Sequence, residues 1–308
     1  MKNKVWIALV LLGVFSCDSI EDKKGRFLLK GNEKMEENDP KSAIEFYQEA
    51  IELDSLYTDA YYNKALAHLS LNQLSEAIED LSKAIQLRPD YEEAIFQRGL
   101  CYLDNGEFYK AREDGDRLLS LNPELWKSHF LSGLVQEKLK NLDSALSHFQ
   151  KARELKPDNS DLWVNEATIL FYQKRFEEAK NLLLEAEQLN ANESNIYNLR
   201  SMILFEEKDY GSALEQVEKA IELDNRQAYF YNNKGLYLLF TDRLEEGLSL
   251  INQSIQMDPK NPFALRNKGI YYVLKGDKVS ALQYLNEISQ DYPDMELVQE
   301  YLQKALSL

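Results

Sequence analysis

The chain has few of the residues from which disulfide-stapled or metal-bound proteins are built. Only two of its 308 residues are cysteine and three are histidine, while glycine occurs 12 times and proline seven times. Two cysteines cannot form a disulfide framework, and so little glycine excludes a collagen-like or low-complexity chain. The sequence also lacks the HExxH, GxSxG, GxGxxG, Walker and paired-cysteine motifs of common enzyme and metal sites.

Basic residues are scarce relative to acidic ones. The chain has 36 Lys and Arg against 52 Asp and Glu, a formal net charge of −16 at pH 7, and no segment concentrates its basic residues. A surface of this sign repels a phosphate backbone, which argues against general nucleic-acid binding. Apolar residues make up 44% of the chain and aromatic residues 11%, so the chain can bury a core and is not globally disordered.

Long apolar runs are absent except at the N-terminus. Residues 5–15 are apolar and follow Lys2 and Lys4, but a run of this length is too short for a membrane span of about 20 residues. The pattern predicts a secretory signal peptide over residues 1–16. Its end, Val14-Phe15-Ser16-Cys17, resembles the lipobox of bacterial lipoproteins. That resemblance implies cleavage before Cys17 and acylation of Cys17; the alternative is a signal peptide that contains a cysteine by chance.

Cleavage at this point would leave an exported chain with a net charge of −18, because Lys2 and Lys4 are removed. Residues 17–23 would then be an acidic, lipidated tether, and acyl chains hold a protein on a membrane without a spanning helix. We expect the outer membrane, on its periplasmic side or surface-exposed, rather than the inner membrane. Cys101 lies in an apolar helical stretch, where we expect a buried small side chain rather than a reactive thiol.

A small residue recurs every 34 residues through the rest of the chain, without insertion or deletion. This marker is Ala43, Ala77, Ala111, Ala145, Ala179, Ala213, Gly247 and Ala281. With the marker at position 20, eight repeats cover residues 24–57, 58–91, 92–125, 126–159, 160–193, 194–227, 228–261 and 262–295. Position 8 is also small in every repeat, and five of the seven prolines fall at position 32, where proline ends a helix.

Each repeat carries two blocks of apolar residues spaced three and four apart, with a break near position 15. This spacing predicts two antiparallel helices and a turn. The pattern resembles the tetratricopeptide repeat, a 34-residue helix-turn-helix unit, and residues 58–91 match that family closely. The resemblance implies an all-α, right-handed α-solenoid of eight hairpins. Residues 296–308 carry one apolar stripe and are predicted to form a capping helix over the eighth repeat.

The third repeat departs from the pattern at position 24, where Gly115 replaces a large apolar residue. We predict a locally weak joint there, because glycine lowers helix propensity by about 1 kcal/mol relative to alanine. The neighbouring Glu113, Asp114 and Asp116 are interpreted as a solvated helix face rather than a cation site. The three histidines are interpreted as structural, and no metal or other cofactor is expected.

The first helix of each repeat carries the candidate binding surface. In tetratricopeptide proteins, positions 2, 5, 6, 9, 12 and 13 line a concave groove, and here these positions are rich in aromatic residues and asparagine. The predicted groove residues are Tyr62, Asn63, Phe96, Phe130, Asn165, Phe171, Tyr172, Asn198, Phe205, Tyr229, Asn232, Asn233, Phe240, Phe263, Arg266 and Asn267. Aromatic anchors and amides that pair with a backbone favour a protein or peptide ligand. The alternative is that the stripe packs against itself.

The sequence thus predicts a non-enzymatic interaction scaffold or adaptor, lipid-anchored in the bacterial envelope, that holds a protein or peptide in its groove. Its layout resembles lipoproteins that serve envelope proteases, pilus assembly or outer-membrane assembly, and layout does not choose among them. The alternative function is a self-associating structural or assembly factor of the pilotin kind, active as a homo-oligomer. An enzyme or enzyme subunit is disfavoured because the sequence offers no chemical centre.

Overall fold

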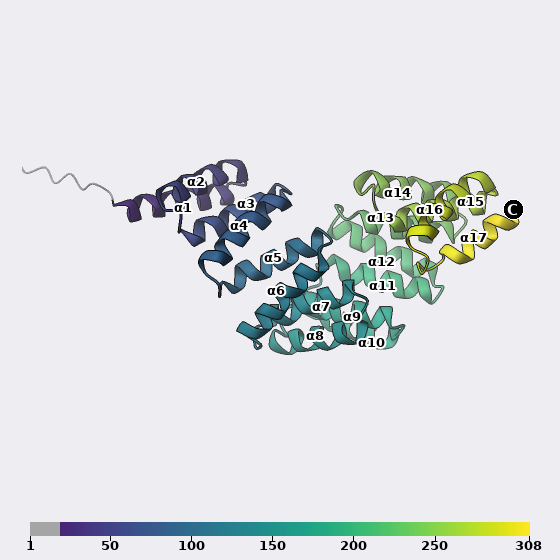
Figure 1. The fold of residues 1–308 in the computed structure, drawn as a ribbon. Helices are drawn as coiled ribbons and strands as arrows, with labels where there is room; N and C mark the ends of the chain where they lie inside the picture. The colour runs from purple at the N-terminus through teal and green to yellow at the C-terminus, as the bar shows by residue number, and fades with distance from the viewer. Residues whose placement is uncertain (1–18) are drawn as a thin grey trace, which may run out of the picture. The chain divides into compact units, whose positions relative to one another are not determined.

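The computed structural model describes residues 19–308, and within this range the chain forms seventeen α-helices and no strand (Figure 1). The predicted all-α solenoid of helix hairpins is confirmed. Cys17 and the predicted signal peptide lie outside the described residues. Over residues 19–308, none of the helices combines the length and apolarity that crossing a bilayer requires.

Each repeat contributes two helices. The first helices are α1 (Ile20–Glu36), α3 (Thr58–Ser70), α5 (Glu92–Asp104), α7 (Trp126–Lys138), α9 (Ser160–Tyr172), α11 (Ser194–Glu206), α13 (Ala228–Leu239) and α15 (Pro262–Lys275). The second helices are α2 (Pro40–Leu53), α4 (Leu74–Leu87), α6 (Phe108–Leu121), α8 (Leu142–Leu155), α10 (Phe176–Leu189), α12 (Tyr210–Leu223), α14 (Leu244–Met257) and α16 (Lys278–Asp291). The C-terminal helix α17 (Val298–Ser307) follows them.

The chain divides into two compact units, the first ending at Val135 and the second comprising Gln136–Leu308. The division falls inside α7. We call them the N-terminal unit and the C-terminal unit and describe each by itself.

The helix boundaries follow the sequence repeat. Seven of the first helices begin at position 1, and all eight second helices begin at position 17. The residue at position 15 has a positive φ, between 56° and 74°, in every repeat: Asn38, Asn72, Gly106, Lys140, Lys174, Lys208, Asp242 and Gly276. A left-handed residue ends the first helix and turns the chain back toward the second. The seven marker alanines are fully buried, so the two helices of each hairpin approach closely at position 20.

Two helices approach closely in the seventh repeat, where the markers at positions 8 and 20 are both glycine. A Cβ atom placed on Gly235 would lie 2.9 Å from the carbonyl oxygen of Gly247. Real Cβ atoms do not come so close to a backbone oxygen, so α13 and α14 have this separation only because both residues lack a side chain.

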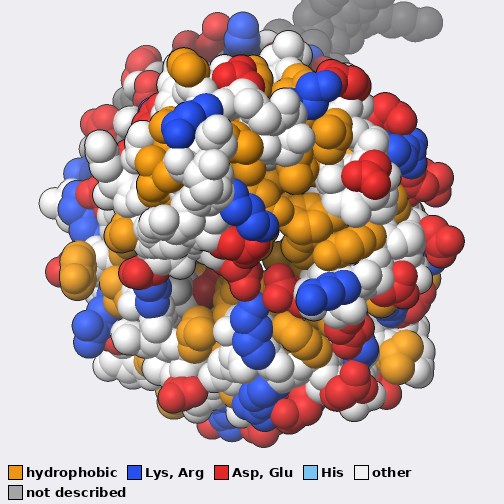
Figure 2. Space-filling model, turned by 90° about the vertical axis from the view of Figure 1, so that its right-hand side faces the viewer, with side chains coloured by type: hydrophobic (Ala, Val, Ile, Leu, Met, Phe, Trp, Pro, Cys, Tyr) orange, Lys and Arg blue, Asp and Glu red, His pale blue; other side chains and the backbone are white. Residues whose placement is uncertain are grey.

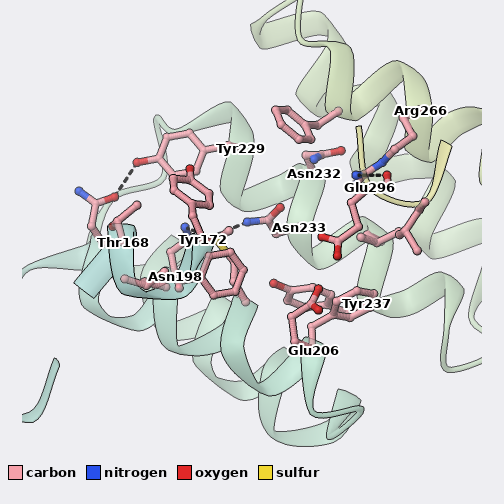
Figure 3. A pocket seen from close by; sticks show the side chains of 18 of the residues that line it. Thr168, Tyr172, Asn198, Glu206, Tyr229, Asn232, Asn233, Tyr237, Arg266 and Glu296 are labelled. Atoms are coloured by element: carbon pink, nitrogen blue, oxygen red, sulfur yellow. Dashed lines mark hydrogen bonds between the residues drawn. The ribbon is translucent and has the colours of Figure 1, made fainter. Parts of the chain in front are cut away.

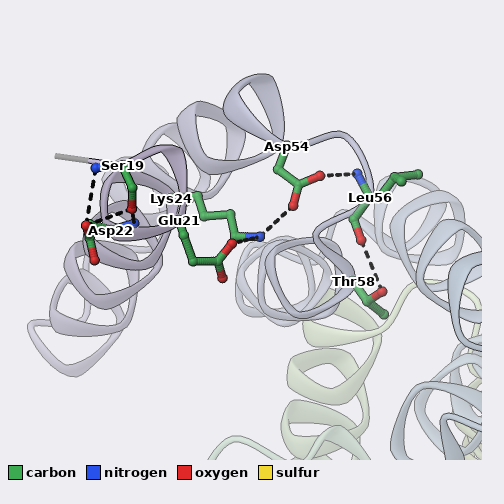
Figure 4. A network of polar contacts seen from close by, with 7 residues as sticks. All are labelled: Ser19, Glu21, Asp22, Lys24, Asp54, Leu56 and Thr58. Carbon is green, nitrogen blue, oxygen red and sulfur yellow. Dashed lines mark hydrogen bonds and ion pairs between the residues drawn. The ribbon is translucent and has the colours of Figure 1, made fainter. Parts of the chain in front are cut away.

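The first helix begins earlier than predicted. The tether prediction covered residues 17–23, but α1 starts at Ile20, because Ser19 and Asp22 form a capping box in which each side chain accepts from the other's backbone (Figure 4). Lys24 then pairs with Glu21 at 2.7 Å and with Asp54 at 2.6 Å. The acidic residues Glu21 and Asp22 therefore belong to the folded first repeat, and only Ser19 among the described tether residues precedes the helix.

One interpretation of the third repeat is corrected by the structure. Asp114 is not on a solvated face: it is 2% exposed, and Arg98 binds both of its carboxylate oxygens, at 2.6 and 2.9 Å. Burial raises the pKa of Asp114, and the Arg98 guanidinium opposes that shift. The locally weak joint at Gly115 stays a prediction, and beside this glycine the fully buried side chain of Leu131 lies against both Gly99 and Gly115.

The predicted capping helix is present. Val298, Tyr301 and Ala305 on α17 are buried, and the helix packs against α15 and α16, so it covers the apolar side of the eighth hairpin. Cys101 is 2% exposed, and burial raises the pKa of its thiol to about 11. Because the thiolate is the reactive form, Cys101 is a packing residue.

Charges of both signs are interspersed on the surface despite the net negative charge. On the face shown in Figure 2, acidic and basic side chains alternate around apolar ones. Exposed pairs within one helix turn, such as Arg175 with Glu178 at 2.7 Å, account for part of this mixing. Pairs of this kind contribute little to stability individually.

Candidate binding pocket

A pocket of about 600 Å³ opens in the C-terminal unit. It is lined by first helices of the last four repeats, α9, α11, α13 and α15, together with the loop before α17. Ten of the predicted groove residues line it: Asn165, Phe171, Tyr172, Asn198, Phe205, Tyr229, Asn232, Asn233, Phe263 and Arg266. The sequence positions that predict a concave surface therefore do converge on one hollow in this unit.

Three of the six pocket aromatics are exposed, and the other three, Phe171, Phe205 and Tyr237, are not. Tyr172, Tyr229 and Phe263 are 46%, 37% and 49% exposed, so their rings are available to a ligand. Phe171 is 7% exposed, and Phe205 stacks on the buried Tyr237 with ring centroids 4.9 Å apart. The exposed rings can anchor a ligand, while the other three support the pocket wall.

The asparagines connect successive first helices to each other. The amide of Asn233 donates to the side-chain oxygen of Asn198 at 2.9 Å, and that of Asn267 donates to Asn232 at 2.8 Å. In both pairs, position 6 of one repeat donates to position 5 of the repeat before it. Asn267 is fully buried and does not line the pocket. We expected these amides to pair with a ligand's backbone, but part of their hydrogen-bonding capacity holds α11, α13 and α15 together.

One end of the pocket is charged. Lys174, in the turn after α9, contacts Glu206 of α11 at 3.1 Å and Glu296 of the C-terminal loop at 2.9 Å. Arg266 on α15 donates to the backbone oxygen of Glu296 at 3.0 Å (Figure 3). Arg266 is only 6% exposed, and burial lowers the pKa of its guanidinium to about 10. This buried cation bonds to neutral oxygens of Asn267 and Glu296 rather than to a carboxylate.

The six remaining predicted groove residues lie elsewhere. In the N-terminal unit, Tyr62 packs against Tyr91, and Phe96 contacts Trp126 and Phe130, with ring centroids 5.0 to 6.4 Å apart. Asn63 donates to Asn32 at 3.0 Å. In the C-terminal unit, Phe240 packs edge-on against Phe205 at 5.1 Å and also contacts Tyr301 of α17. These aromatic residues pack against one another, as the alternative interpretation of the stripe expects.

Sequence reasoning missed several residues that line the pocket. Thr168 and Met202 occupy position 9, Asn195 position 2 and Glu206 position 13. All four lie on the same stripe, so applying the positions to every residue type, rather than mainly to aromatic rings and asparagines, would have found them. Lys174 and Glu296 lie outside the stripe, in a turn and in the C-terminal loop, and no pattern in the sequence indicates that they meet.

Side chains suited to holding a metal ion do not gather in the pocket. Across residues 19–308, no group of three or more His, Cys, Asp or Glu side chains could hold a metal ion. His68 lies outside the pocket, with Nε2 3.5 Å from an oxygen of Asp80, which also pairs with Lys64 at 3.0 Å. That cluster joins α3 to α4 inside one hairpin.

The comparison with known proteins agrees with this architecture. Four family models, each described as tetratricopeptide repeat, match residues 58–91, 138–203, 96–160, and 26–55 with 194–227. No curated protein matches the chain in sequence.

Several solved structures share the fold. The APC/C hetero-tetramer Cut9-Hcn1 aligns with a TM-score of 0.68 and 16% identity, over 94% of this chain and 57% of that one. Yeast Tom70 aligns with a TM-score of 0.59 and 20% identity, over 95% of this chain and 65% of that one. Pseudomonas aeruginosa pilF aligns with a TM-score of 0.52 and 23% identity, over 69% of this chain and 97% of that one. The chain thus spans less than two thirds of the first two structures.

Sequence repeat, hairpin geometry and family models therefore agree: the chain belongs to the tetratricopeptide repeat family.

Proposed function

We propose that the protein is a lipid-anchored adaptor of the bacterial cell envelope that binds an extended segment of a partner protein in the pocket of its C-terminal unit. The observation that carries the binding proposal is the set of exposed aromatic side chains, Tyr172, Tyr229 and Phe263, around one hollow. Aromatic residues in a concave site supply large contact areas at low entropic cost, and they dominate many protein interfaces.

The size of the pocket favours a peptide over a folded domain. A volume of about 600 Å³ accepts a few side chains and their backbone. The wall also offers polar groups, such as Asn165, Asn195 and Thr168, beside the aromatic rings. Such a mixture orients a backbone while the rings bury its apolar side chains. The envelope location rests on the predicted signal peptide and on the lipobox at Cys17.

Capture of the partner by the full chain, crosslinked in its native host, tests the binding proposal. The variant Tyr172→Ala/Phe263→Ala removes two exposed rings without opening the core. We expect recovery of the captured partner to fall by more than about tenfold, because truncating an aromatic hot spot costs at least one power of ten in affinity. Tyr109→Ala is the matched control, since Tyr109 is 73% exposed and does not line the pocket. Equal recovery with both variants would rule out the pocket as the binding site.

Anchoring is tested separately. Cells fed an alkyne fatty acid should label the wild-type chain and leave Cys17→Ser unlabelled, and the variant should leave the membrane fraction. Cys101→Ser is the control, because a buried thiol is not an acylation site. Membrane retention of Cys17→Ser would contradict the anchor.

A further inference from the structure

Part of the pocket wall comes from outside the helix hairpins. Residues 292–297, which we call the strap, connect α16 to α17, and two of them, Glu296 and Leu297, line the pocket beside side chains of α9, α11 and α15. The strap therefore occupies one end of the surface proposed to bind a partner.

The strap contacts the pocket through the same kinds of groups that a bound peptide would use. Its Glu296 carboxylate pairs with Lys174 at 2.9 Å, and its Glu296 backbone oxygen accepts from Arg266 at 3.0 Å (Figure 3). Leu297 follows on the pocket wall. One side-chain carboxylate, one backbone carbonyl and one apolar side chain thus make contacts with the pocket, and none of the three requires that the segment belong to this chain.

Release of the strap would take away hydrogen-bond and ion-pair partners from side chains of the pocket. Arg266 is 6% exposed and contacts no carboxylate, so loss of the Glu296 oxygen would leave a buried cation short of an acceptor. A buried charge without hydrogen-bond partners is strongly unfavourable. A segment that replaces the strap must therefore bring an oxygen to Arg266, which a backbone carbonyl can supply, and an acidic side chain would restore the second carboxylate beside Lys174, which keeps Glu206.

The strap is also attached in a way that favours exchange. The side chains of Lys174 and Glu296 are 53% and 56% exposed, so solvent screens their ion pair. Leu297 has φ +66°, a left-handed conformation that a branched aliphatic residue rarely adopts. Helix α17 after it is anchored by Val298, Tyr301 and Ala305, so the strap can move while the cap stays packed.

We infer that the Lys174–Arg266 end of the pocket binds an acidic residue followed by an apolar residue in a partner's peptide, and that the strap is a built-in competitor for this place. This inference rests on the proposed function and names the chemistry of the partner. The strap lowers the apparent affinity for the partner by the fraction of molecules in which it occupies the site.

A peptide copy of the strap tests the inference. The probe is a fluorescent peptide with the sequence of residues 292–299, Tyr-Pro-Asp-Met-Glu-Leu-Val-Gln, acetylated and amidated, and its binding to the full chain is followed by fluorescence anisotropy. Glu296→Ala removes the strap's ion pair with Lys174 and keeps its backbone oxygen on Arg266, so the strap is held more weakly and the probe's Glu can pair with Lys174. We expect this variant to bind about fivefold more tightly than wild type, the size of effect that one exposed ion pair supports.

Three controls define the result. Glu246→Ala breaks the exposed pair with Arg243 outside the pocket and should bind the probe as wild type does. Adding Lys174→Ala to Glu296→Ala should abolish the gain, and a probe with Gln in place of its Glu should show none. Thermal unfolding by circular dichroism and hydrogen exchange over residues 298–307 verify that α17 stays folded in each variant.

Equal probe affinity for wild type and Glu296→Ala, or equal binding of the Glu and Gln probes, would overturn the inference. The partner-capture experiment then separates the two proposals. If the probe does not bind but Tyr172→Ala/Phe263→Ala still loses the partner, the strap inference fails and the proposed function stands. If recovery of the captured partner is also unchanged in Tyr172→Ala/Phe263→Ala, the proposed function fails as well.

Discussion

The N-terminal and C-terminal units place their semi-buried charges differently. In two repeats of the N-terminal unit, the basic residue at position 7 pairs with the acid at position 23 of the same repeat: Lys64 with Asp80 and Arg98 with Asp114. In three repeats of the C-terminal unit, the position 7 residue pairs with the second helix of the preceding repeat. These pairs are Glu166 with Arg153, Arg200 with Glu187 and Lys234 with Glu218.

The difference separates two ways of holding a helix repeat together. Pairs inside a hairpin fix its two helices to each other, while pairs between hairpins couple neighbours along the stack. The C-terminal unit adds the asparagine bridges between first helices. Its pocket requires four successive first helices to keep their spacing, and contacts between hairpins supply that coupling.

The largest expected effect comes from breaking one pair of each kind. Arg98→Ala leaves Asp114 buried and unpaired, and Arg153→Ala does the same to Glu166, so we expect each to lower the free energy of unfolding by about 3–5 kcal/mol. Urea unfolding measures the loss. Hydrogen exchange should rise mainly within α5 and α6 for Arg98→Ala, and across both α8 and α9 for Arg153→Ala. The same spread of exchange in both variants would remove the distinction between the units.

The pH dependence of Arg98→Ala provides a further check. Because burial raises the folded-state pKa of Asp114, the folded chain binds more protons there than the unfolded chain, and this group's contribution to stability falls as pH rises through the raised value. Without Arg98, that pKa rises further. The deficit of the variant should therefore be smaller at about pH 4.5 than at about pH 7. A deficit independent of pH would show that Asp114 is not the cause.

Apolar packing couples hairpins in the N-terminal unit, and replacing Leu131 by alanine tests that coupling. Leu131→Ala should cost about 2–5 kcal/mol of unfolding free energy, because its side chain fills the space beside two glycines and its loss leaves a cavity. Leu121→Ala serves as the comparison, since Leu121 is 42% exposed. A small effect of Leu131→Ala, measured by urea unfolding, would mean that the neighbouring helices close the gap.

A smaller loss is expected from the glycine contact of the C-terminal unit. Gly235→Ala places a methyl group 2.9 Å from the carbonyl oxygen of Gly247, and overpacking of this kind costs about 1–3 kcal/mol. Because α13 lines the pocket, the displaced helix should also weaken binding of the strap peptide to Glu296→Ala. Unchanged stability would indicate that α13 and α14 can separate freely.

The smallest expected effect has the opposite sign. Gly115→Ala in the N-terminal unit should gain up to about 1 kcal/mol, from the higher helix propensity of alanine. The new methyl group would lie 3.2 Å from the side-chain oxygen of Ser132, which can rotate away. A loss of stability in urea unfolding would show that Leu131 and Ser132 already fill this space completely.

The fold could be predicted from the sequence because its determinants are local and repeated. Small residues at positions 8 and 20 and prolines at position 32 mark the hairpins, and the first helices begin where the repeat does. The exception is α1, which begins at Ile20 because a capping box precedes the repeat. Capping depends on two side chains, Ser19 and Asp22, that no repeat position encodes.

The candidate site could be predicted only where it follows the same stripe. Tyr172 and Phe263 were found because their positions face the groove in any such repeat. Asp114 was misjudged because its partner, Arg98, lies 16 residues away on another helix and only the packed hairpin brings them together. The charged end of the pocket joins Lys174 to Glu296, 122 residues apart in the chain, a contact set by the stacking of four repeats rather than by any local pattern.

The placement of α17 restricts how an array of this kind can evolve in length. Val298, Tyr301 and Ala305 are buried on the apolar side of the eighth hairpin, so a further hairpin could stack directly on that side only if α17 were displaced. Duplication of an internal 34-residue unit would instead preserve both the cap and the hairpin beneath it. If the array lengthened by duplication, the two neighbouring repeats that are most similar in sequence are therefore expected to lie in the interior of the chain.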